Sequence, residues 1–324
     1  ARMANDRCLF KSGKANVMRI LERPLKRMCI LGALVGLSWL VACTSGPART
    51  PRMGDADRAT DKVVVDPADA GELSRLLDAV AAKRVVYVGE SHDRYDHHLN
   101  QLAVIRGLDE RGLKLAIGVE FFQEAFQPDV DAYLAGRIGE REMLRKTEYF
   151  KRWRYDFRLY RAILEYARDR GIPMIALNAP SEMVDAVSKD GIEGLDPAYR
   201  RRLPARIAPA DADYERRMRD ACRLHGDLPE ERVQRFMEVQ SEWDEYMARR
   251  AAEYLEKNPD RTLVVLVGAA HVLHDSAIPQ RLRQYRPVTD AVVVTRPYEP
   301  LPGVMPDFVF LSRDSDLEPP GSLG

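Results

Sequence analysis

The sequence predicts an α/β fold, with a mostly parallel sheet flanked by helices and a smaller all-helical inserted lobe. Near the start of the domain, apolar runs of strand length alternate with amphipathic helical segments, which suits a parallel sheet with crossover helices. Two apolar runs that lie far apart in the chain both end on Gly-x-x-His. Two long charged stretches, at about 123–170 and 181–258, are expected to supply the helical lobe over the carboxyl edge of the sheet.

The individual elements follow from apolar periodicity and run length. Residues 66–82 place Leu73, Leu76, Leu77 and Val80 on one helical face, and residues 97–111 repeat this spacing. The strand from 171 to 178 is entered through a glycine and a proline. In chain order, strands are expected at 85–88, 113–119, 171–178, 262–267, 288–294 and 308–311.

The amino end has the pattern of a leader with a lipoprotein signal peptide, residues 1–42. Basic residues precede the apolar run 28–42, which is short for a membrane span. Leu40-Val-Ala-Cys43 fits the bacterial lipobox, so we expect lipid attachment (palmitate included) at Cys43; a plain signal anchor that contains a cysteine is the alternative. Because Thr44 rather than Asp follows, the outer membrane is favoured, with the domain in the periplasm or at the surface of the bacterial envelope.

Composition limits the remaining parts of the chain. Residues 43–61 are expected to form a tether, 62–312 the α/β domain, and 313–324 a disordered tail. The chain has 50 basic and 50 acidic side chains, so no global basic field favours nucleic acid as a partner. Cys222 is the single cysteine after Cys43, which excludes a disulfide framework or a cysteine-rich metal site in the domain.

Three polar residues follow three of the expected strands. His92, Glu120 and His271 lie just past the apolar runs, and the carboxyl edge of an open α/β sheet is where ligands bind. The set could hold a divalent metal with an open position for water, or serve as general acid and base groups. Alternatively, these three residues are structural polar groups at strand ends with no role in binding or catalysis.

An aromatic and basic stretch lies between the second and third strands. Tyr149, Tyr155 and Tyr160 alternate with Lys and Arg side chains, which could form a flat apolar wall with cations at its rim. Such a wall would suit haem and its propionates, and tyrosinate is a haem iron ligand. An amphipathic helix that packs its aromatics inward, or a nucleic-acid surface, would give the same pattern. Further on, Gln240 and Asp244 share a helix face that either lines the site or lets Asp244 pair with an arginine.

Several short motifs together resemble the ChaN family of haem-binding, iron-uptake-associated bacterial lipoproteins, within the wider group of Tiki metalloproteases and erythromycin-esterase-like proteins. The resemblance covers about residues 65–312. It is carried by these motifs: Val-Gly89-Glu-Ser-His92-Asp, Gly118-Val-Glu120-Phe-Phe, Ala176-Leu-Asn178-Ala-Pro, Gln240-x-x-Trp-Asp244-x-x-Met247-Ala and Val267-Gly-Ala-Ala-His271-Val.

The resemblance implies haem bound at a dimer interface, with a tyrosine as the iron ligand and a histidine assisting. No single haem tyrosine can be aligned, so Tyr149, Tyr155, Tyr160 and His98 are candidates. The resemblance also implies that four further polar residues support the site: Glu90, Asn178, Gln240 and Asp244.

The sequence therefore predicts a lipid-anchored envelope protein that binds haem and takes part in haem or iron uptake. Its expected partners are haem, the membrane, a second copy of the chain, and haem receptor or transporter components. One alternative is a metal-dependent or acid/base hydrolase that uses His92, Glu120 and His271. A second alternative is a non-catalytic envelope scaffold.

Overall fold

The structure is a computed structural model that describes residues 63–204, 207, 212, 215, 216, 219, 229–273, 277–296 and 306–311. The leader, Cys43, the tether, Cys222 and the tail lie outside these residues, so the expectations about them stay predictions. Within the described ranges, none of the helices combines the length and apolarity needed to cross a bilayer.

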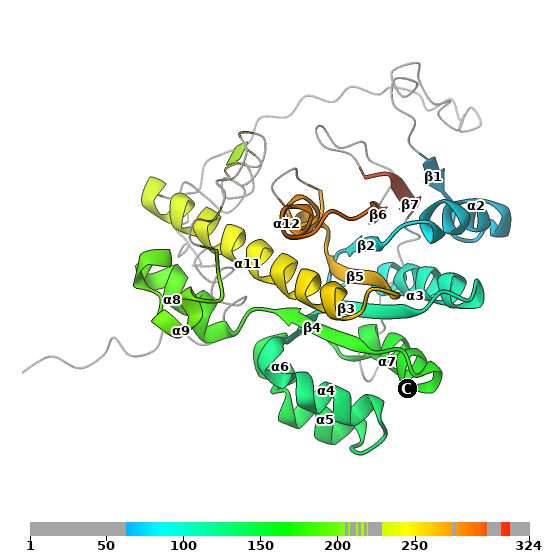
Figure 1. Cartoon of the computed structure of the whole chain (residues 1–324), viewed down its shortest axis with the longest axis horizontal. Helices are drawn as coiled ribbons and strands as arrows, with labels where there is room; N and C mark the ends of the chain where they lie inside the picture. Colours follow the sequence, from blue (N-terminus) through cyan, green and yellow to red (C-terminus); the bar gives the residue numbers. More distant parts are fainter. Residues whose placement is uncertain are drawn as a thin grey trace, which may run out of the picture.

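Seven parallel strands form one sheet in the order β1-β7-β6-β2-β5-β3-β4 (Figure 1). β2, β5 and β3 are neighbours, and Glu90 at the end of β2 pairs in register with Gly268 at the end of β5. All of their carboxyl ends therefore meet at one edge. The strands are β1 (Val63–Val65), β2 (Val85–Glu90), β3 (Leu115–Gln123), β4 (Met174–Asn178), β5 (Thr262–Gly268), β6 (Asp290–Arg296) and β7 (Phe308–Leu311).

Helices cover both faces of this sheet, and each face has its own apolar core. One core contains alternate strand residues such as Val86 and Val88 together with α2, α3 and α7. The other contains Val85 and Tyr87 together with α8, α11 and α12. The helices on the first face are α2 (Ala70–Ala81), α3 (Tyr95–Glu110), α4 (Gln127–Leu134), α5 (Glu140–Lys146), α6 (Tyr149–Arg152) and α7 (Arg158–Arg170). On the second face lie α8 (Ser181–Asp190), α11 (Glu230–Lys257) and α12 (Ile278–Tyr285), with α9 (Pro197–Arg200) beside them.

The predicted fold class, a mostly parallel sheet flanked by helices, is confirmed. The two inserted helical stretches lie on opposite faces of the sheet: α4 to α7 follow β3, and α8 to α11 follow β4. Several strand bounds differ from the expected ones; β4, for example, begins at Met174 and not at 171. The strand β1 is not among the expected strands, and β3 runs on to Gln123, past the expected end at 119.

The chain leaves β2 toward one face and β5 toward the other. α3, which follows β2, packs into the first core, whereas α12, which follows β5, packs into the second. Where neighbouring parallel strands send their connections to opposite faces, a crevice opens at their carboxyl ends. This topology places a site at the β2–β5–β3 edge.

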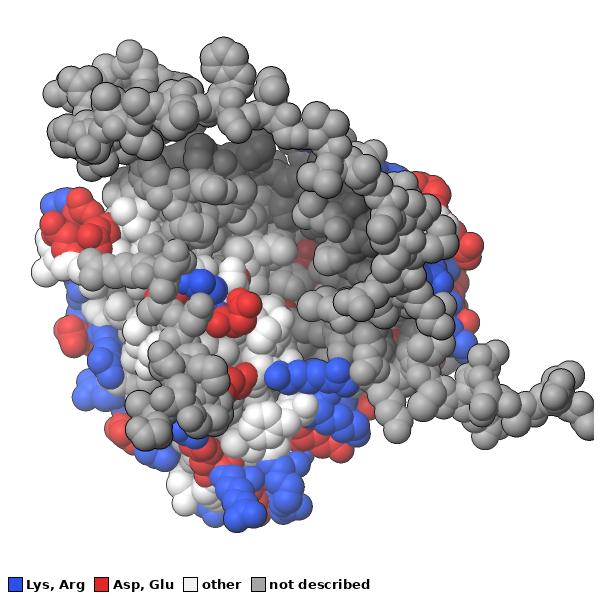
Figure 2. Space-filling model, turned by 180° about the vertical axis from the view of Figure 1, so that it is seen from behind, with Lys and Arg blue, Asp and Glu red and all other residues white. Residues whose placement is uncertain are grey.

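The described side chains on one face of the domain match the balanced composition of the chain. On the face drawn in Figure 2, the described Lys and Arg side chains are interspersed with Asp, Glu and uncharged residues. A surface of this kind generates no single-sign field over that face.

Candidate functional site

His92 stands just past β2 and is held by the last residue of that strand. Its Nδ1 lies 2.6 Å from Oε1 of Glu90, whose residue is 5% exposed. Burial alone would raise the pKa of Glu90, but the charge and hydrogen bond of His92 outweigh it and lower that pKa. An ionised Glu90 therefore accepts the Nδ1 proton, and Nε2 is left to face Glu120 at 3.9 Å.

His271 mirrors this arrangement from the end of β5. It ends the short 3-10 helix η4 (Ala269–His271), and its Nδ1 lies 2.5 Å from Oδ1 of Asp244 on α11. Its Nε2 lies 3.3 Å from Oε1 of Glu120. Burial opposes a charged imidazole, yet Glu120 and Asp244 overcome that effect and raise the pKa of His271 to about 10. His271 is therefore an imidazolium at neutral pH.

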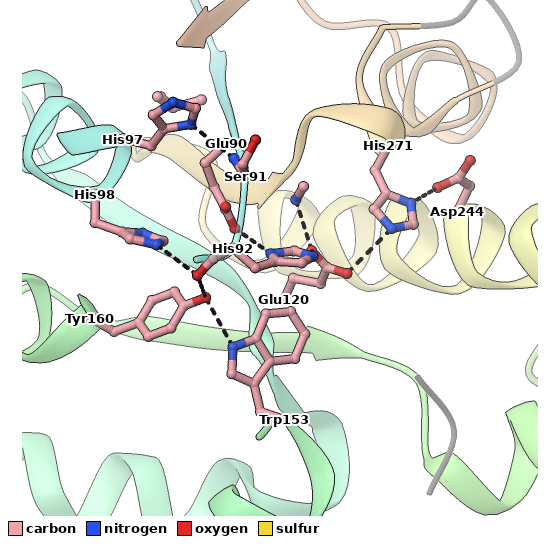
Figure 3. Close-up of polar contacts among 12 residues, drawn as sticks. Glu90, Ser91, His92, His97, His98, Glu120, Trp153, Tyr160, Asp244 and His271 are labelled. Carbon is pink, nitrogen blue, oxygen red and sulfur yellow. Dashed lines mark hydrogen bonds and ion pairs between the residues drawn. The ribbon is translucent and has the colours of Figure 1, made fainter. Parts of the chain in front are cut away.

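Glu120, on β3, lies between the two histidines (Figure 3). Its Oε2 accepts the backbone N–H of Gly268 at 2.8 Å. A glycine suits this position, because a Cβ at position 268 would lie 3.0 Å from Cε1 of His92 and the imidazole would have to shift. The result is a continuous polar chain, Glu90–His92–Glu120–His271–Asp244, which we call the carboxylate–histidine centre.

Aromatic side chains from the first inserted stretch form a wall beside His92. The rings of Trp153 and Tyr155 lie 4.7 and 5.0 Å from the imidazole. Between them, Arg154 has a φ of 72°, a left-handed conformation that is uncommon for a residue other than glycine. The turn that carries both rings to His92 is therefore locally strained, a state that persists when surrounding packing enforces it.

The backbone of His92 is fixed as well. Its carbonyl oxygen accepts the hydroxyl of Tyr160 at 3.3 Å and faces Nε2 of His98 at 3.2 Å. Tyr160 in turn accepts the indole N–H of Trp153 at 3.0 Å (Figure 3). Trp153, Tyr160 and His98 thus position His92, a role that the sequence pattern does not predict for Trp153.

The four candidate haem ligands differ in how far their side chains are buried. Tyr149, Tyr160 and His98 are each 1% exposed, so they present no donor atom to the surface. Tyr155 is half-buried, and no hydrogen bond to its hydroxyl is found among the described residues. Burial, with the charges of Glu90, Asp93 and Glu120, raises the pKa of Tyr155 to about 12.

The other supporting residues lie nearer the periphery of the centre. Asn178, at the end of β4, is 4% exposed, and its Oδ1 has no hydrogen-bond partner among the residues that the structure describes. It lines a small cavity of about 10 Å³ together with Tyr149 and Trp153, which is room for about one water molecule. Gln240 is partly buried on α11, one helical turn before Asp244.

The geometry does not support the expected divalent-metal site. In the part of the chain that the structure describes, no three His, Cys, Asp or Glu side chains are placed to hold a metal ion. The reason is that each imidazole Nδ1 is engaged by its own carboxylate, while each Nε2 faces a different oxygen of Glu120. The two Nε2 atoms and the Glu120 carboxylate therefore pair with one another, and they do not converge on one position that a metal ion could occupy.

Fold and site together define an α/β domain with a polar centre at the carboxyl edge of a parallel sheet. The family model described as "Haem-binding uptake, Tiki superfamily, ChaN" matches residues 76–282. Since this match covers more than half of the 324 residues, the chain belongs to that family.

Solved structures are similar to this chain over most of its length. A structure described as cofacial haem binding to ChaN of Campylobacter jejuni is 16% identical, with a TM-score of 0.55, and the match covers 72% of this chain and 91% of that one, which supports the fold. An erythromycin esterase mutant, EreC, in its open conformation is 16% identical with a TM-score of 0.44, over 70% of this chain and 73% of that one.

A plant protein is also similar over part of its length. Protein RETICULATA-RELATED 5, chloroplastic, of Arabidopsis thaliana is 27% identical over 161 residues, which is 48% of this chain. The matched region is only 21% of that protein, so the chain corresponds to about a fifth of its length.

Proposed function

We propose that this chain binds haem through Tyr155 and takes part in haem or iron uptake at the bacterial envelope. Membership of the haem-binding family supports the ligand. The observation that carries the choice of residue is the half-buried Tyr155, whose hydroxyl has no hydrogen-bond partner among the described residues. A phenolate oxygen is a known ligand of haem iron, so this donor fits the group.

The surroundings of Tyr155 suit a large planar ligand with acidic substituents. Phe150 is 59% exposed in the same segment, which offers apolar surface. Arg154 is an exposed cation close to it in the sequence, as is Lys151, which pairs with Glu148 at 2.9 Å; both would attract propionates. Bound iron would supply the positive charge that offsets the raised pKa of Tyr155, and the aromatic wall would exclude water from one side of the ligand.

The remaining parts of this proposal concern location and assembly. We propose a lipid anchor on Cys43 at the outer membrane, a homodimer, and exchange of haem with receptor or transporter components. The lipobox supports the anchor. Metabolic labelling with palmitate, compared between the unaltered chain and Cys43→Ser, tests it, and equal labelling of both would contradict it.

The haem proposal is tested by titrating the purified chain with hemin and recording the Soret band. We expect a shifted Soret band that saturates for the unaltered chain and is lost or weakened at least tenfold in Tyr155→Phe. Tyr254→Phe is the matched control, because Tyr254 is also a partly buried tyrosine but lies near the end of α11, which leads into the start of β5 at the opposite edge of the sheet. Equal hemin affinity in all three proteins would contradict the assignment.

The carboxylate–histidine centre favours a second candidate function, an acid/base hydrolase. Its specific support is the pair of carboxylate-oriented imidazoles, which resembles the arrangement that general acid and base groups need. Glu90 orients His92 so that Nε2 could accept a proton from water. His271, as an imidazolium, could stabilise negative charge that develops on a substrate.

A panel of 4-nitrophenyl esters tests this second function. If the centre is catalytic, His92→Ala lowers kcat/KM by about 10²-fold or more, whereas Glu256→Gln, an exposed change on α11, leaves it unchanged. Hydrolysis that is equal in both variants would exclude the centre as its source. A non-catalytic scaffold becomes the preferred reading if neither hemin binding nor hydrolysis is found.

A further inference from the structure

The imidazole of His92 is enclosed on nearly every side by groups that are themselves buried. Glu90 lies against its Nδ1, and Glu120 faces its Nε2; these two side chains are 3% and 2% exposed. The backbone at Gly268 closes a third side, since a Cβ added there would lie 3.1 Å from Nε2. Trp153, which is 3% exposed, closes a fourth.

His92 nevertheless keeps 20% of its side chain exposed. Among the described rings that contact it, Tyr155 is the one that is itself half-buried, at 5.0 Å between ring centroids. Of the described rings around this imidazole, Tyr155 is therefore the one that is also open to solvent. Solvent has little access to the carboxylate–histidine centre through His271, because the side chain of His271 is only 8% exposed.

The hydroxyl of Tyr155 is also electrostatically close to the centre. Besides burial, the charges of Glu90, Asp93 and Glu120 contribute to its raised pKa, and two of these carboxylates belong to the carboxylate–histidine centre. Trp153 contacts both rings, at 4.7 Å from His92 and 5.5 Å from Tyr155. The two proposed sites thus share one wall.

We propose that the haem face and the carboxylate–histidine centre are a single site, so that haem held by Tyr155 closes the solvent path to His92. This inference rests on the proposed haem binding at Tyr155. A porphyrin is several times broader than the phenol ring that would hold it, and the partly exposed imidazole of His92 lies 5.0 Å from that ring between centroids. Haem binding and any chemistry at His92 are therefore mutually exclusive, and haem acts as the regulator of the centre.

Chemical modification of His92 measures this coupling without needing a substrate. Diethyl pyrocarbonate acylates an accessible unprotonated imidazole, and peptide mass spectrometry gives the rate at His92. We expect one equivalent of hemin to lower that rate at least tenfold in the full chain. N-acetylhistidine in the same tube reports whether hemin consumes the reagent.

Two variants make the result specific. In Tyr155→Phe, hemin should leave the rate at His92 unchanged, whereas Tyr254→Phe should retain full protection. If the Soret band shows that hemin is bound and His92 still reacts at its original rate, the single-site inference is wrong while haem binding stands. If no Soret band forms at all, haem binding fails and the coupling fails with it. Protection that persists in Tyr155→Phe would overturn the role given to Tyr155.

Discussion

Glu242 gives the most quantitative prediction for the stability of this fold. It lies on α11 with an exposed fraction of 0%, and neither carboxyl oxygen has a hydrogen-bond partner within the described part of the chain. Burial, and after it the charge of Asp244, raises the pKa of Glu242 to about 8 from an ordinary value of 4.5. The folded protein therefore holds this carboxyl protonated at neutral pH.

The free energy of unfolding should consequently fall as the pH rises. Between pH 4.5 and 8 the folded state binds more protons at Glu242 than the unfolded state does, so the slope against pH is negative. A difference of about 3.5 pKa units corresponds to about 5 kcal/mol at 1.36 kcal/mol per unit. From pH 5 to pH 9, about 4 kcal/mol of this should be lost, as an order of magnitude.

Urea unfolding at pH 5, 6, 7, 8 and 9 measures the effect, with Glu242→Gln compared to the unaltered chain. His271, whose pKa is raised to about 10, contributes stability that is complete below pH 6.5 and lost as the pH rises toward 10. Because both proteins keep His271, the difference between their curves isolates Glu242. Glu256→Gln, at an exposed position of the same helix, should run parallel to the unaltered chain. Parallel curves for Glu242→Gln as well would refute the reasoning.

Three further predictions each concern a single residue. Gly107→Ala should destabilise the fold by about 1–3 kcal/mol in urea unfolding, because its Cβ would lie 2.2 Å from Cδ1 of the buried Leu77; unchanged stability would show that the α2–α3 contact is loose. Asp244→Asn should lower the pKa of His271, measured by NMR of the imidazole, by about 1 unit or more, and an unchanged pKa would assign the shift to Glu120 alone. Hemin affinity should rise about tenfold per pH unit between pH 6 and 7.5, because iron must displace a proton from Tyr155; pH-independent affinity would point to another ligand.

Much of the sheet is predictable from the sequence because its strands are buried on both faces. β2 and β5 are almost fully buried, and such strands appear in the sequence as continuous apolar runs. β1 escapes prediction because three residues, Val63–Val65, give no periodicity, and their partner β7 lies more than two hundred residues away. The expected strand at 113–119 stops short of the end of β3, because the last residues of β3 follow a register shift after Val119, beyond the apolar run.

The site is predictable in part, for a topological reason. Parallel strands bring their carboxyl ends to one edge, so the amino-acid sequence alone suffices to place His92, Glu120 and His271 together. The aromatic stretch is visible in the sequence, but the position of Trp153 and Tyr155 beside His92 has no such signal. That position depends on the left-handed backbone of Arg154, and an arginine gives no sign of such a turn.

The burial of one haem candidate does have a sequence signal. Tyr160 stands at helical spacing with Ile163, Leu164 and Ala167, all of which pack into the same core. That spacing identifies an inward face of α7. It therefore predicts that Tyr160 is buried, and it makes no such prediction for Tyr155, which precedes the helix. Glu242 also stands at helical spacing with buried residues, Val239 and Tyr246, but a carboxylate on that face is not expected to be enclosed.

The ligand of the haem iron is the central claim, and resonance Raman spectroscopy of the ferric hemin complex tests it most directly. If Tyr155 binds the iron, the unaltered chain and Tyr254→Phe will show vibrations of an iron-bound phenolate, and Tyr155→Phe will lack them. Phenolate vibrations that persist in Tyr155→Phe, or a spectrum of imidazole ligation in the unaltered chain, would contradict the assignment.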